Sequence, residues 1–128
     1  MVLMDTCALI WWTLDPGKLS ETAAIACREI ANTGGIISSI SIWEIGIKIK
    51  KGKIDLGISL EEYVSRLKLL DQLRIVPIDE DIWMENITLD WSHKDPADRT
   101  IVATAKLENV PIITRDDIIR EFYPNTIW

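Results

Sequence analysis

The sequence predicts an α/β fold, in which helices flank a parallel sheet of four to five strands. Short apolar runs alternate along the chain with segments of helical pattern, and this alternation is typical of parallel sheets with right-handed crossovers. Residues that favour helix starts stand between these runs. The chain has 128 residues and is 48% hydrophobic, which is enough for one core without disulfides. No repeat, low-complexity tract or linker divides it, so we expect one domain over residues 1–128.

The first elements follow from caps and turn residues. The expected order is a strand over 2–4, a helix over 6–14, a helix over roughly 21–33 and a strand from 36. Asp15-Pro16-Gly17 halts the first helix. Ser20 is a favoured N-cap for the second helix, and Gly34-Gly35 ends it.

The segment 40–54 is ambiguous. Ile45, Ile47 and Ile49 alternate with other residues, which is the period of a strand, whereas Ile42, Ile45 and Ile49 share one helical face. The stretch Ser41 to Glu44 matches the capping-box pattern and favours a helix that starts at Ser41. Propensity alone leaves both alternatives open.

The second half is expected to continue the alternation. The expected elements are helices over roughly 60–72, 79–90 and 96–109, strands over 74–78 and 110–114, a short helix from 116 and an edge strand over 126–128. Asp95-Pro96 is a strong helix start, because an acid at the N-cap precedes proline at the first helical position. Residues 52–57 are the expected loop.

Composition narrows the class of protein. The N-terminal sequence MVLMDTC does not resemble a signal peptide, and no apolar run approaches the roughly 18 residues that a membrane span needs. Cys7 and Cys27 are too few for a disulfide framework, so we expect buried reduced thiols and a cytoplasmic protein. Trp43 and Trp83 are expected in the core. One ring of the Trp11-Trp12 pair is expected at a dimer interface, unless a neighbouring helix covers it.

Acids at element boundaries are the main chemical signal. The four acids are Asp5, Glu44, Asp98 and Asp116. In open parallel sheets, functional groups gather beyond the carboxyl ends of the strands. Carboxylates converging there need a cation, and oxygen ligands favour Mg²⁺ or Mn²⁺. Each acid also has a simpler explanation in helix capping or macrodipole complementarity. The spacing thus indicates a metal-dependent hydrolase of phosphodiesters only as a candidate.

The charge pattern bears on nucleic acid. The net charge of −6 argues against a broad electrostatic grip on phosphates. A local basic cluster nevertheless follows Glu44 and consists of Lys48, Lys50, Lys51 and Lys53. Arg66, Lys68 and Arg74 extend this cluster. It is either a phosphate contact or a solvated helix end.

The sequence lacks the residues that zinc sites, phosphate-binding loops and serine hydrolases require. His93 is the only histidine, and this argues against a histidine-rich zinc site. A lone histidine before a helix is more often a structural or surface residue than a catalytic one. No Walker-type loop, G-x-G-x-x-G turn or G-x-S-x-G elbow is present.

Four segments carry a resemblance to a known family. They are Leu3-Met4-Asp5-Thr6, Ser41-Ile42-Trp43-Glu44-Ile45 with Lys48, His93-Lys94-Asp95-Pro96-Ala97-Asp98-Arg99 with Ala103 and Ala105, and Ile113-Thr114-Arg115-Asp116. In these segments the chain resembles the PIN-domain ribonucleases, specifically the VapC-type toxins of toxin–antitoxin pairs. The His-x-Asp-Pro-x-Asp-Arg segment is the most specific, and the match runs over essentially the whole chain.

The resemblance implies a metal-dependent endoribonuclease that pairs with an antitoxin, forms a homodimer and has a helix over 41–51. It implies that Asp5 and Asp98 bind Mg²⁺ or Mn²⁺ directly, while Glu44 and Asp116 bind directly or through water. It also implies that Thr6 and Thr114 orient carboxylates or water, that Arg99 pairs with acids, and that the lysine cluster contacts RNA. Cys7 departs from the family, because relatives often carry a polar residue there.

Two competing functions remain open. The first is a non-catalytic PIN-like module that binds a partner protein, although the presence of all four acids argues against it. The second is an α/β phosphatase with Asp5 as nucleophile. That chemistry usually wants a second acid two residues later, where this chain has Cys7.

Overall fold

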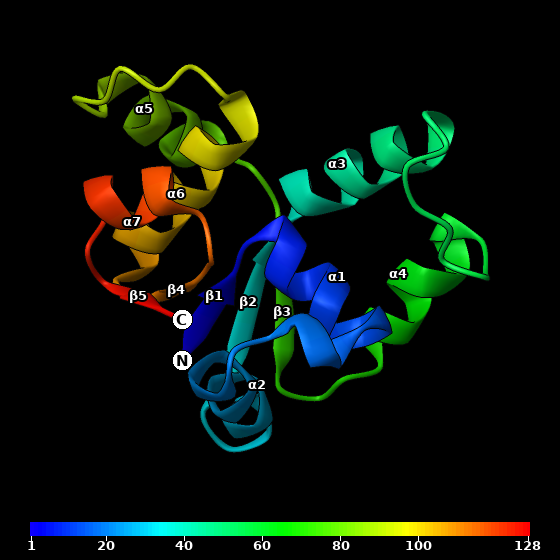
Figure 1. Ribbon diagram of the computed structural model, residues 1–128. Helices are drawn as coiled ribbons and strands as arrows, with labels where there is room; N and C mark the ends of the chain where they lie inside the picture. The colour runs from blue at the N-terminus through cyan, green and yellow to red at the C-terminus, as the bar shows by residue number, and fades with distance from the viewer.

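The computed structural model describes residues 1–128 as a five-stranded parallel sheet with seven α-helices around it (Figure 1). The strands are β1 (Val2–Met4), β2 (Gly35–Ser38), β3 (Leu73–Val76), β4 (Ile112–Ile113) and β5 (Thr126–Ile127). The helices are α1 (Thr6–Leu14), α2 (Glu21–Thr33), α3 (Ser39–Lys50), α4 (Leu60–Lys68), α5 (Glu80–Thr88), α6 (Pro96–Glu108) and α7 (Asp117–Phe122), with a 3-10 turn over Pro16–Lys18. The predicted fold class is confirmed.

The strand order places the candidate site. The sheet runs β3-β2-β1-β4-β5, so the chain builds outward from β1 on one side and then returns to β1's other side with β4. Leu3 of β1 is in register with Ile36 of β2 and Ile112 of β4. A sheet whose order reverses in this way opens a crevice beyond the carboxyl ends of β1 and β4.

Two hydrophobic clusters fill the space on the two faces of the sheet. Neighbouring residues of one strand point to opposite faces, so Leu3 belongs to one cluster and Met4 to the other. The Met4 cluster packs under α1, α2, α3 and α4. The Leu3 cluster packs under α5, α6 and α7, and Figure 1 shows these helices grouped on their own side of the sheet.

Residues 39–50 are helical, but the helix does not begin where the capping-box pattern places it. The N-cap is Ser38, whose hydroxyl accepts a hydrogen bond from the Ile40 N–H at 3.2 Å. Ser41 lies inside the helix and is buried. Glu44 is therefore not a capping residue, and its carboxylate is free for another role.

The other helix starts agree with the sequence more closely than the helix ends do. Ser20, Ser59, Asp79 and Asp95 cap α2, α4, α5 and α6 with their side chains. By contrast, α4 ends at Lys68 rather than near residue 72. No helix or strand covers residues 51–59, where Gly52 and Gly57 adopt positive φ angles of 68° and 73°.

Two expectations about tryptophans are wrong. Trp43 is 57% exposed and Trp83 is 44% exposed. On α3 the buried residues are Ser41 and Ile45, each two positions from Trp43 and so nearly opposite it on the helix. On α5 the inward-facing residues are Ile82 and Asn86, and Trp83 lies about 100° around the helix from Ile82, at the side of the buried face.

The two cysteines differ in burial, and the two neighbouring tryptophans differ in what they contact. Cys27 is buried as expected, whereas Cys7 is exposed, and both are free. Trp12 packs against the Met4 cluster. Trp11 lies with its ring centroid 5.6 Å from that of Trp128. None of the helices is both long and apolar enough to span a bilayer.

Candidate active site

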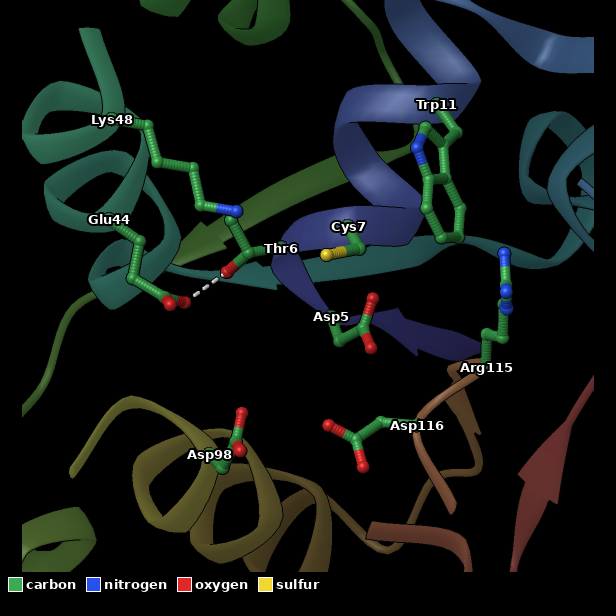
Figure 2. A pocket seen from close by; sticks show the side chains of 9 residues that line it. All are labelled: Asp5, Thr6, Cys7, Trp11, Glu44, Lys48, Asp98, Arg115 and Asp116. Atoms are coloured by element: carbon green, nitrogen blue, oxygen red, sulfur yellow. Dashed lines mark hydrogen bonds between the residues drawn. The ribbon is translucent and has the colours of Figure 1, made fainter. Parts of the chain in front are cut away.

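All four predicted acids lie in one pocket at the carboxyl ends of β1 and β4 (Figure 2). They come from the β1–α1 junction, α3, α6 and the loop before α7. The lining residues are Asp5, Thr6, Cys7, Trp11, Glu44, Lys48, Asp98, Arg115 and Asp116. Residues up to 111 positions apart in the chain thus meet where the sheet topology predicts a crevice.

Asp5 is the most buried of the four acids. One carboxylate oxygen accepts the N–H of Ala8 at 2.7 Å and so caps α1. The other oxygen accepts the hydroxyl of Thr114. Burial raises the pKa of Asp5 to about 6, and the charges of Asp98 and Asp116 push it the same way, while the two hydrogen bonds limit the rise.

Glu44 is held by Thr6. The Thr6 hydroxyl donates to the Glu44 carboxylate and lies 2.9 Å from the hydroxyl of Ser41. Because its single proton goes to Glu44, Thr6 accepts from Ser41. Burial raises the pKa of Glu44, and the Thr6 hydrogen bond opposes that rise.

Asp98 sits in the first turn of α6, which Asp95 caps by accepting the N–H groups of Ala97 and Asp98 at 2.9 and 3.0 Å. His93 Nε2 lies 2.7 Å from Asp98 Oδ2. Burial raises the pKa of Asp98, and the hydrogen bond with His93 lowers it. The lone histidine therefore contacts a site carboxylate, which its position in the sequence did not indicate.

Asp116 caps α7 by accepting the Ile118 N–H at 2.8 Å. Its own N–H donates to the Thr114 hydroxyl at 3.0 Å. Thr114 thus connects Asp5 and Asp116, since it donates to one residue and accepts from the other.

Arg99 does not pair with acids, contrary to the expectation. Its guanidinium donates to four backbone carbonyls, at distances between 2.6 and 3.2 Å, and to the side chain of Asn86; the carbonyls belong to Asn86, Leu89, Trp91 and His93. Five donors on one planar group allow this number of contacts. Arg99 therefore fixes the segment 86–93, which carries His93 toward Asp98.

The basic cluster divides at the pocket. Lys48 lines it, whereas Lys50, Lys51 and Lys53 are exposed and do not. Trp11 and Arg115 also line it, and the sequence reasoning did not select them. A signal existed for both: Trp11 follows Cys7 by four residues on α1, and Arg115 directly precedes Asp116.

The donor set fits a hard divalent cation. The four carboxylates offer only oxygen atoms, which suit Mg²⁺ and Mn²⁺. They surround the pocket without closing on one point, and no three of them have the geometry of a preformed metal site. Mg²⁺ commonly binds through one or two carboxylates and keeps several waters, so such an arrangement suits it.

The PIN domain family matches residues 2–123, and the chain therefore belongs to this family. Ribonuclease VapC22 of Mycobacterium tuberculosis is 28% identical over 131 residues, which cover 99% of this chain and 98% of that protein.

Solved structures agree on the fold. One is a toxin–antitoxin complex from Klebsiella pneumoniae, with 25% identity, a TM-score of 0.67, and coverage of 100% of this chain and 97% of that chain. Another is VapBC2 of Rickettsia felis bound to a DNA fragment from its promoter, with 20% identity, a TM-score of 0.68, and coverage of 98% and 96%.

Proposed function

We propose that this protein is an endoribonuclease that hydrolyses RNA phosphodiester bonds with Mg²⁺ or Mn²⁺ and acts as the toxin of a toxin–antitoxin pair. The observation that carries the proposal is the convergence of four carboxylates from four separate elements in one pocket. The family match and the similarity to a ribonuclease over the whole chain support it.

In this proposal, Asp5 and Asp98 bind the metal ion directly, and Glu44 and Asp116 bind it directly or through water. A bound divalent ion supplies charge neutralisation at the phosphate and a lowered pKa for water. The chain's own contribution is orientation. Thr114 fixes Asp5 and Thr6 fixes Glu44, each by donating its hydroxyl proton to the carboxylate.

A general base completes the site. The carboxylate of Glu44 or that of Asp116 accepts the proton of the attacking water. Glu44 is suited to this step because burial raises its pKa, and a more basic carboxylate takes a proton more readily.

The proposed partners are an RNA substrate, an antitoxin protein and a second copy of the chain in a homodimer. The Klebsiella relative was solved in a toxin–antitoxin complex, which supports the antitoxin. The acid pocket offers charge that a basic side chain of such a partner would complement.

The phosphatase alternative fits the pocket less well. A nucleophilic Asp5 usually wants a second acid two residues later, and Cys7 stands at that position in the pocket. Failure to trap a phospho-aspartyl adduct on Asp5 is the expected result.

The test is RNA cleavage by the purified protein with Mg²⁺, with Mn²⁺ and with EDTA. Asp98→Asn should lower the cleavage rate by at least about a hundredfold. Even mutation of a residue that only supports a metal ligand lowers metal affinity or activity by about 10 to 100-fold. Asp95→Asn is the matched control, because asparagine also caps helices and Asp95 does not line the pocket.

Metal-dependent cleavage by Asp98→Asn at the unmodified rate would contradict the assigned site. If the unmodified chain cleaves neither unstructured nor structured RNAs with either metal, the partner-binding alternative replaces the enzyme.

A further inference from the structure

One edge of the acid pocket is lined by residues that the proposed metal chemistry does not use. Trp11 reaches it from α1 and Arg115 from the loop between β4 and α7 (Figure 2). The guanidinium carbon of Arg115 lies 5.8 Å from the centroid of a Trp11 ring, within the range of a cation–π contact. Trp128 packs against Trp11 with their ring centroids 5.6 Å apart.

Arg115 keeps its charge unpaired beside four carboxylates. It is exposed and takes part in none of the chain's six ion pairs. Lys48, which lines the pocket from α3, is likewise in none of them. Figure 2 shows the two cations on opposite sides of the acids. An anionic ligand that lies across the pocket therefore meets a free positive charge on each side.

The aromatic ring beside Arg115 adds a second kind of contact. Proteins that bind single-stranded nucleic acid combine cations for the backbone with aromatic rings on which bases stack. An arginine guanidinium plane also stacks with bases. Trp11 and Arg115 provide an aromatic ring and a guanidinium at one place.

We propose that Trp11 and Arg115 form a nucleotide-binding edge, where Arg115 binds a phosphate next to the scissile one and an unpaired base stacks on the Trp11–Arg115 pair. This inference rests on the proposed function and assigns two residues that position the RNA beside the scissile phosphate.

The charge balance of the molecule supports a single strand over a duplex. With a net charge of −6, the chain repels phosphate backbones at long range, so affinity must come from short-range contacts. A duplex keeps its bases paired and stacked inside the helix, and its deep major groove does not admit side chains. Only an unpaired base is able to reach the Trp11 ring.

The experiment measures RNA binding in the Asp98→Asn background with Mg²⁺, so that the RNA stays intact. The probes are a short fluorescein-labelled single-stranded RNA and the same strand in a duplex. Arg115→Met and Trp11→Leu should each weaken single-strand binding about tenfold, while Trp11→Phe should keep most of the affinity because it retains a ring. Arg115→Met should also reduce the salt dependence of binding by about one phosphate contact.

Arg28→Met is the matched control, because Arg28 is an exposed arginine on α2 and does not line the pocket. Arg28→Met removes the same charge as Arg115→Met but away from the pocket. The RNA affinity of this variant should therefore stay within about twofold of the parent. Arg115 is exposed, and its substitution leaves the core untouched even if Trp11→Leu proves unstable.

Cleavage by the otherwise unmodified chain separates the two proposals. If that chain cleaves RNA but Arg115→Met binds single strands as Arg28→Met does, the nucleotide-binding edge is wrong and the proposed function stands. Equal affinity for the duplex and the single strand also overturns it. If the variants lose binding although the unmodified chain cleaves nothing, the edge stands and the ribonuclease assignment fails.

Discussion

The acid pocket has two walls that hold their carboxylates by different means. In the first wall, Asp5 and Glu44 each accept a threonine hydroxyl. In the second wall, Asp98 and Asp116 stand at the starts of α6 and α7. The first wall depends on contacts between distant parts of the chain, since Thr114 lies 109 residues from Asp5. The second wall depends on contacts that are nearer in sequence, since His93 precedes Asp98 by five residues and Thr114 precedes Asp116 by two.

This difference determines what each wall is sensitive to. The carboxylate of Asp5 is buried and its pKa is raised to about 6, so the first wall responds to ionisation. Asp98 depends on His93, and His93 is carried by a segment that Arg99 holds through four carbonyls. The second wall is therefore sensitive to loss of the hydrogen bonds that hold the segment carrying His93.

The largest effect is expected from Arg99→Leu. Asn86 is buried, so removing the guanidinium leaves its backbone carbonyl and its side-chain oxygen without a donor, and each unsatisfied group costs about 1–3 kcal/mol. We expect the free energy of unfolding to fall by about 3–5 kcal/mol in urea titrations.

Two other arginine variants sharpen that result. Arg99→Lys should lie between the parent and Arg99→Leu, because one ammonium group does not span four carbonyls. Arg74→Leu removes an exposed ion pair with Glu108 and should cost less than about 1 kcal/mol. If Arg99→Leu costs no more than Arg74→Leu does, the segment 86–93 does not depend on Arg99.

The next effect is the pH dependence of stability in EDTA, which tests the first wall. The pKa of Asp5 is 3.8 unfolded and about 6 folded, so the folded state binds more protons between these values. Stability should fall as the pH rises from about 4 to about 6, by up to about 3 kcal/mol from Asp5. Well below pH 3.8 the carboxyl is protonated in both states, and the loss is absent.

Asp5→Asn should remove this fall and make the metal-free protein more stable than the parent at pH 7.5. Asparagine keeps an oxygen that accepts the Ala8 N–H. Asp117→Asn is the control, since that side chain is 97% exposed and should leave the pH profile unchanged. A profile for Asp5→Asn that still falls between pH 4 and 6 would mean that another acid dominates.

The four acids also differ in how far the sequence predicted them. Asp5, Asp98 and Asp116 stand at strand ends and helix starts, which simple rules identify. Because parallel strands share one carboxyl edge, these rules made a shared acid site a candidate, and the resemblance to the PIN domains selected it. Glu44 was harder, since a capping box with Ser41 explained it, and only the start of α3 at Ser39 excludes that explanation.

The supporting residues could not be predicted, because their partners are set by tertiary structure. Arg99 was expected to meet acids, but it meets carbonyls that no sequence pattern marks. Trp43 and Trp83 were placed in the core by hydrophobicity alone, although the face of each helix that packs inward decides their exposure. The contact between Trp11 and Arg115 likewise joins positions more than 100 residues apart.

The smallest effect is expected at His93 and concerns the second wall alone. His93→Phe keeps an aromatic ring beside Trp91, whose ring centroid lies 4.8 Å from that of His93, but removes the nitrogen that contacts Asp98. His93→Gln removes the ring and retains a donor to replace Nε2. Calorimetric titration with Mn²⁺ should show about tenfold weaker binding for His93→Phe and near-parental binding for His93→Gln, as expected for a partner that orients a ligand. The reverse order would show that ring packing, rather than the hydrogen bond, positions Asp98.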